Sequence, residues 1–236
     1  MEVDKTIEPF LPADFAADPM KYFEEQGAII RTGEITYKKH GWFKCDPASV
    51  RDFPVWRNSA GGELHVVGKR VNPLKSDVWR ARNPFYEFLV MELVLALGFK
   101  TSRPYARIAQ RGVYYIIAEK VEGFRWVRSQ DSGIEEADLV RLRAEAETVM
   151  LQLAASMDGA GVRIPWHSKD MILIFEPNTL TVKEVVPIDW ERLELDFEKL
   201  SQIPQVEHLL NGLKPKVSRE KRWISEEWKQ KRQARG

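Results

Sequence analysis

The pattern of apolar residues changes once along this chain, near residue 122, and this change restricts the possible folds more than any other feature. Before it, short runs rich in β-branched and aromatic residues predict strands. These runs are 34–45, 62–72, 105–110 and 113–121. A single helix is predicted among them at 84–97, where apolar residues recur every 3.6 positions and Gly98 supplies a stop. Residues 1–30 read as a loop-rich segment with one short helix near 18–27.

The second half of the chain is predicted to be mainly helical. A long amphipathic helix is expected from Ile134 to Met157, ended by the "DGAG" turn. Two short strands follow at 171–175 and 183–188, and they are expected to form a hairpin. Helices at 196–212 and 218–233 have weaker patterns.

This order of elements predicts an α+β fold with two lobes. We expect an N-terminal extension at 1–30, a mostly β N-terminal lobe at 31–121 and a mainly helical C-terminal lobe at 122–212. A basic tail at 213–236 completes the division.

Composition excludes several classes of protein. With 44% hydrophobic and 30% charged residues, the 236-residue chain can bury a core. A single cysteine, Cys45, excludes an internal disulfide and a multi-cysteine metal site, and it favours a reducing compartment. The longest apolar run, 88–99, contains Glu92 and is too short to span a membrane. Because the first residues lack the pattern of a signal peptide, we expect a cytoplasmic protein.

Charge is concentrated at the C-terminal end. The tail, 213–236, carries nine Lys/Arg and three Glu, a net charge of +6. Such a run is most often a solvated helix. Its two tryptophans, Trp223 and Trp228, also allow docking on the body of the protein, contact with another protein, or stacking on nucleic-acid bases.

Two carboxylates flank the predicted hairpin. Asp170 comes directly before its first strand, and Asp189 follows its second strand after the apolar "VVPI". In an antiparallel hairpin these ends lie side by side, and Mg²⁺ is bound through one or two carboxylates plus substrate phosphates. One interpretation is that Asp170 and Asp189 form a magnesium site. The other is that the two aspartates only mark the ends of the strands. His167 is a candidate to orient the loop before Asp170.

A lysine and two helix glutamates form a second group of candidates. Lys69 follows a Gly-containing turn (Gly61 and Gly62) on a predicted strand, a pattern that can place backbone N–H groups and an ammonium on phosphates. Glu87 or Glu92, on the next helix, is the expected partner of Lys69.

The order of these features resembles the protein-kinase-like fold. The "PIDWER" stretch (187–192) is similar to the metal-binding stretch of aminoglycoside phosphotransferases and lipopolysaccharide kinases. The stretch 83–108 is similar to a helix and strand of bacterial phosphoinositide-kinase-like and toxin-kinase families. The resemblance implies an ATP- and Mg²⁺-dependent phosphotransferase whose acceptor is not specified. It makes Lys69 the phosphate contact, Glu87 its partner and Asp189 the main metal ligand. The adenine would lie against Ala118, Glu119 and Val121.

The sequence departs from that pattern in the loop "IPWHSKDMILI" (164–174), which offers a single acidic residue. If Asp170 binds metal, the catalytic position falls near Pro165 or His167. If Asp170 is catalytic, the second metal ligand is absent. Both a divergent kinase and a nucleotide-binding pseudokinase therefore remain open.

Two other functions compete with a kinase. "AEKVEGFRW" (118–126) is similar to the nucleophile motif of nucleic-acid ligases, in which Lys120 would form the covalent adduct and the lysines of "LKPK" (213–216) would assist. Only 116 residues follow Lys120, fewer than such a domain needs. A non-catalytic scaffold with a kinase-like shape is the third hypothesis.

Overall fold

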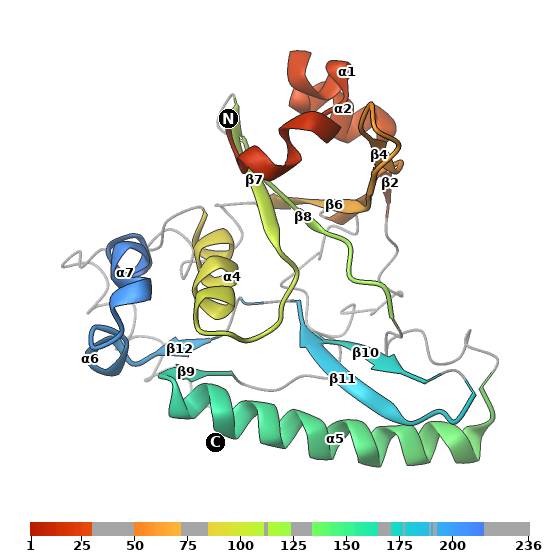
Figure 1. The fold of residues 1–236 in the computed structure, drawn as a ribbon, viewed down its shortest axis with the longest axis vertical. Coiled ribbons are helices and arrows are strands. Elements are labelled where there is room, and N and C mark those ends of the chain that lie inside the picture. Colours follow the sequence, from red (N-terminus) through yellow and green to blue (C-terminus); the bar gives the residue numbers. More distant parts are fainter. Residues whose placement is uncertain are drawn as a thin grey trace, which may run out of the picture.

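The structure is a computed structural model of the chain. It describes residues 1–29, 50–71, 85–110, 113–123, 134–164, 171–176, 178–188, 190 and 193–214. The fold is α+β with two lobes, as predicted: a six-stranded sheet forms the N-terminal lobe, and the longest helix lies in the other lobe (Figure 1). The strand predicted at 34–45 and the helix predicted at 218–233 lie outside the described residues.

The sheet of the N-terminal lobe is antiparallel at every described pairing, in the order β1-β7-β8-β6-β3-β2. Its strands are β1 (Glu2–Val3), β7 (Pro104–Gln110), β8 (Val113–Glu119), β6 (Val66–Val71), β3 (Val50–Asp52) and β2 (Ala28–Ile29). The strands predicted at 105–110 and 113–121 are confirmed as the β7–β8 hairpin. Strand β1 was not predicted, because two residues carry no periodicity.

One face of the sheet is covered by an aromatic core, called here the outer core. Residues 1–29 supply much of it through η1 (Lys5–Phe10), α1 (Ala13–Ala17) and α2 (Pro19–Gln26), of which only α2 was predicted. The small hairpin β4 (Trp56–Arg57) and β5 (Glu63–Leu64) also packs there. The aromatic members are Phe15, Tyr22, Phe23, Phe53, Trp56, Tyr105 and Tyr115. Burial of these rings fixes the first residues of the chain against the sheet.

The other face of the sheet packs on α4 (Tyr86–Ala96), which lies between the two lobes (Figure 1). Eight of its eleven residues are buried, and a helix that is apolar on all sides is expected in a core. The core around α4, called here the inner core, includes Ile116 and Ala118 of β8 and Leu209 and Leu210 of the second lobe. Thus α4 joins the two lobes.

The second lobe is built on α5 (Glu136–Gly159). The hairpin of β10 (Met171–Phe175) and β11 (Val182–Pro187) packs on this helix, and both strands were predicted. A second pair of strands joins β9 (Val162–Arg163) to β12 (Glu194–Leu195). The remaining elements are α6 (Phe197–Leu200), η6 (Pro204–Val206) and α7 (Glu207–Leu213). Among the described helices, none has the length and apolar character needed to cross a membrane.

Candidate nucleotide site

Lys69 and Glu87 form an ion pair between the sheet and α4. The Lys69 Nζ atom lies 2.8 Å from Glu87 Oε1. The Glu87 side chain is 4% exposed and that of Lys69 is 23% exposed, so the carboxylate is desolvated and the ammonium reaches solvent. A buried carboxylate is costly unless it is paired, and here the lysine supplies the pairing. The structure therefore selects Glu87 over Glu92 as the partner of Lys69.

The surroundings of Lys69 on the inner face of the sheet are apolar. Residues alternate between faces along a strand, so Val67 and Lys69 share a face, and Val67 packs against the inner core. Val67 pairs with Ala118, and Lys69 pairs with Ile116. This face thus presents a partly exposed ammonium beside apolar side chains.

The segment after β8 contains the residues predicted to contact adenine. Ala118 is buried in the inner core, and Val121 is half-buried. The Glu119 N–H donates to the Arg103 carbonyl at 2.8 Å, and its own carbonyl accepts from the Ser102 hydroxyl. The Lys120 N–H donates to the His65 carbonyl at 3.0 Å. The backbone of this segment is consequently held in place by its neighbours.

Lys120, the alternative nucleophile, is held as an ammonium. Its Nζ atom lies 2.8 Å from Asp52 Oδ2 and 3.3 Å from Glu122 Oε1. The hydrogen bond to Asp52, followed by that to Glu122, raises the pKa of Lys120 above its ordinary value. A nucleophilic lysine needs a lowered pKa, so this environment opposes the ligase hypothesis.

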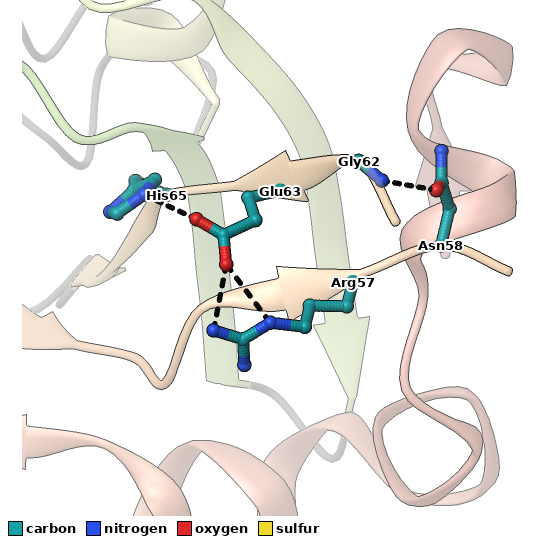
Figure 2. Close-up of polar contacts among 5 residues, drawn as sticks. All are labelled: Arg57, Asn58, Gly62, Glu63 and His65. Atoms are coloured by element: carbon teal, nitrogen blue, oxygen red, sulfur yellow. Dashed lines mark hydrogen bonds and ion pairs between the residues drawn. The ribbon is translucent and has the colours of Figure 1, made fainter. Parts of the chain in front are cut away.

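The Gly-containing turn lies apart from Lys69. It connects β4 and β5, which Trp56 and Leu64 anchor in the outer core, whereas Lys69 faces the inner core. Figure 2 shows the Gly62 N–H donating to Asn58 Oδ1, at 2.7 Å. The Ala60 N–H donates to the same oxygen, and the Gly61 N–H donates to the Asn58 carbonyl.

These bonds already use the N–H groups that a phosphate would need. The nearby Arg57 guanidinium forms two hydrogen bonds with Glu63 Oε1, and His65 lies 3.9 Å from the other oxygen of Glu63 (Figure 2). The structure therefore does not bring Gly61 and Gly62 together with Lys69.

A buried threonine connects the two lobes beside one of the predicted metal ligands. The Thr101 hydroxyl donates to the Pro187 carbonyl at 2.8 Å and accepts from the Trp190 indole N–H at 3.0 Å. Pro187 ends β11, and Trp190 is 1% exposed. One side chain from the loop before β7 thus contacts Pro187 and Trp190, on both sides of position 189. Sequence reasoning did not identify Thr101, because its partners are distant in sequence.

Gly123 brings the segment after β8 against the hairpin. A Cβ atom at this position would clash with Ile172 Cγ2 and would lie 2.6 Å from the Leu173 carbonyl oxygen. Only a glycine allows so close an approach. The end of β8 and strand β10 therefore lie in direct contact.

Three predicted site residues, His167, Asp170 and Asp189, lie outside the described residues. The ends of the hairpin are described, and Met171 pairs with Pro187 there. Within the described part of the chain, no group of three or more His, Cys, Asp or Glu is arranged to hold a metal ion. The magnesium site stays a prediction.

Comparison with solved structures includes matches of low sequence identity. No protein-family model matches the sequence, and no curated protein matches it. Among solved structures, the co-crystal structure of WbdD with the kinase inhibitor LY294002 aligns with 77% of this chain and 39% of the WbdD chain, at 13% identity and a TM-score of 0.37. Monomeric WbdD aligns with 86% of this chain and 48% of its own, at 14% identity and a TM-score of 0.39. The chain spans less than half the length of either, and scores this low assign neither a fold family nor an activity.

Proposed function

We propose that this protein is a divergent kinase-like phosphotransferase that binds ATP with Mg²⁺ between its two lobes. The observation that carries the proposal is the Lys69–Glu87 ion pair, in which a desolvated carboxylate on α4 holds an ammonium that is 23% exposed. A lysine held in this way is a fixed positive charge for phosphate oxygens.

In this proposal the nucleotide lies on the inner face of the sheet. The adenine contacts the segment Ala118, Glu119 and Val121, and the phosphates lie toward Lys69. Asp189 and Asp170 are the residues that would hold Mg²⁺, since carboxylates are the ligands this ion prefers. When bound, the ion neutralises charge on the phosphate oxygens. Catalysis would rest mainly on positioning and on charge neutralisation.

Transfer would follow from an attack on the γ-phosphate. The oxygen of an acceptor hydroxyl forms a bond to the γ-phosphorus while the bond from that phosphorus to the β,γ-bridging oxygen breaks, and ADP leaves. The hydroxyl proton passes to Asp170 if this residue is the base, with His167 orienting the loop. If Asp170 serves only the metal, nucleotide is bound without efficient transfer.

The test separates the structural role of the ion pair from its binding role. Lys69→Met removes the ammonium that contacts the buried Glu87 carboxylate and is expected to destabilise the fold by about 3 kcal/mol. The double variant Lys69→Met/Glu87→Leu replaces the pair with apolar groups and should recover most of that stability. It should nevertheless lose the binding of ATP, because the positive charge is absent.

Binding is measured as a thermal shift with ATP, with and without Mg²⁺. Ligand at about 100 times its Kd raises the melting temperature of a chain of this size by roughly 5–10 °C. We expect this shift in the wild type, a loss in the double variant and a loss of the Mg²⁺-dependent part in Asp189→Asn. An equal shift in wild type and double variant would contradict the site.

Two further measurements separate the competing functions. Release of ADP in the presence of acceptor mixtures indicates transfer, and binding without turnover indicates a pseudokinase. A nucleotide adduct at Lys120, seen by intact mass, indicates a ligase-like reaction. A scaffold requires none of these signals.

A further inference from the structure

Helix α5 has a second apolar face that the described elements do not cover. It is a row of apolar and small residues spaced three or four apart: Ala137, Val140, Ala144, Thr148, Leu151 and Ala155, called here the α5 stripe. All six are exposed, and the two large members, Val140 and Leu151, are 59% and 61% exposed. These two belong to the few large apolar residues on the described surface that are so exposed.

The stripe lies opposite the buried side of the helix. At 3.6 residues per turn its members fall within an arc of roughly 80°, centred about 170° from the buried residues Leu142, Ala146 and Met157. In Figure 1 the strands β9, β10 and β11 all lie on one side of α5, at the boundary of the described molecule. A surface helix needs one apolar face, and a second one over about five turns indicates a second partner.

The charge of α5 distinguishes between possible partners. The helix carries five acidic residues and two basic ones, a net charge of −3. Pairing with α5 of a second copy would bring two acidic helices together and would be opposed by like charges. A basic partner would be attracted.

The chain itself contains such a segment. The tail, 213–236, has a net charge of +6 and includes Val217, Ile224 and Trp228, spaced seven and four residues apart, with Trp223 beside them. This is the spacing of an apolar helix face. The described chain ends at Lys214, and 22 residues follow it. As a helix they would extend about 33 Å, close to the roughly 36 Å of α5.

We propose that the basic tail docks along the α5 stripe of its own chain, with its apolar residues on Val140 and Leu151 and its lysines and arginines beside the acidic residues of α5. This inference is independent of the proposed nucleotide site.

The test is a double-mutant cycle in the full-length protein. One variant is Val140→Ser/Leu151→Ser, the other is Trp223→Ser/Trp228→Ser, and the third combines the four changes. If the two surfaces touch, each double variant has a lower urea midpoint than the wild type. The combined variant is then no less stable than the less stable of the two double variants. Gln152→Ser, on an adjoining exposed face of α5, is the matched control and should leave the midpoint unchanged.

Limited trypsin digestion gives an independent readout, because the tail is rich in lysine and arginine. Cleavage of the tail should rise about tenfold in Val140→Ser/Leu151→Ser, since proteolysis follows the population of the open form. High salt should raise it in the wild type as well. Additive effects in the cycle, or equal cleavage of the tail in wild type and stripe variant, would overturn the proposal. The proposal would also be overturned if the wild type were a dimer in light scattering and Val140→Ser/Leu151→Ser were a monomer with unchanged cleavage of the tail.

Discussion

At the scale of single residues, Glu92 is a carboxylate whose ionisation is disfavoured in the folded protein. It lies half-buried on α4, and burial raises the pKa of Glu92 above its ordinary value, with Arg107 and His208 opposing the rise and Glu2 and Asp4 adding to it. A raised pKa means that the folded state prefers the protonated form. The stability that protonated Glu92 contributes to the fold is fully present below the pKa of this residue in the unfolded chain, about 4.5. It is lost as the pH rises through the pKa of Glu92 in the folded protein.

Glu92→Gln should therefore stabilise the protein at pH 7. The gain over the wild type should shrink as pH is lowered toward 4.5, where the wild-type side chain is protonated too. Urea denaturation at several pH values measures it. The exposed Glu198→Gln serves as control, and a gain for Glu92→Gln that is constant across pH would contradict the assignment.

Gly123 gives a second prediction at this scale. Gly123→Ala places a methyl group 2.6 Å from the Leu173 carbonyl oxygen, so the backbone must move. We expect a loss of about 1–3 kcal/mol in the free energy of unfolding, measured by urea denaturation. Gly159→Ala is the matched control, because a Cβ atom there meets nothing within 4 Å. Equal stability of the two variants would mean that the contact of Gly123 with β10 is wrong.

The pairing of Lys69 shows how far the sequence reaches at this scale. The sequence pattern predicted a strand that carries Lys69 and a following helix that carries two glutamates. It did not decide whether Glu87 or Glu92 pairs with Lys69. The two glutamates point roughly 140° apart on the helix, so only the packing of α4 on the sheet decides between them. The Gly61–Gly62 turn shows the opposite limit, because the Asn58 side chain accepts hydrogen bonds from the N–H groups of Ala60 and Gly62 through contacts that no spacing rule anticipates.

At the scale of elements, Thr101 joins the loop between α4 and β7 to the end of β11. Thr101→Val keeps the shape of the side chain but leaves the Pro187 carbonyl and the Trp190 N–H without their partner. Each buried group left unpaired costs roughly 1–3 kcal/mol. Thr101→Ser retains the hydroxyl and should be markedly more stable than Thr101→Val in urea denaturation. Equal midpoints for the two variants would show that the hydrogen bonds contribute nothing.

The long elements were predictable because their periodicity extends over several turns. Helix α4, helix α5 and the hairpin β10–β11 begin and end within a few residues of the predicted positions. The two-residue strands β9 and β12 were not predicted, since a pair of residues has no period. The helix predicted at 196–212 is divided into α6 and α7, because Pro204 cannot continue a helix and begins the short η6 instead.

At the scale of the whole molecule, the candidate site is assembled from segments that are far apart in sequence. Lys69, the segment Ala118–Val121 and the hairpin come from three separate regions. The order of the strands and helices along the chain predicted an α+β fold with two lobes. The distances between the three parts of the site depend on the packing of α4, which no sequence pattern gives. The network through Thr101 had no sequence signal, because it consists of one hydroxyl between two distant loops.

The pairing of β1 with β7 has a consequence for the order of assembly during synthesis. Glu2 lies opposite Arg107, a separation of 105 residues, and the two also form an ion pair. During synthesis, β1 cannot pair with β7 until more than a hundred residues have left the ribosome. Contacts this distant slow folding and leave early segments exposed to wrong partners. The aromatic residues of α1 and α2 share a core with Tyr105 and Tyr115, so this core cannot be completed until those two residues have been synthesised.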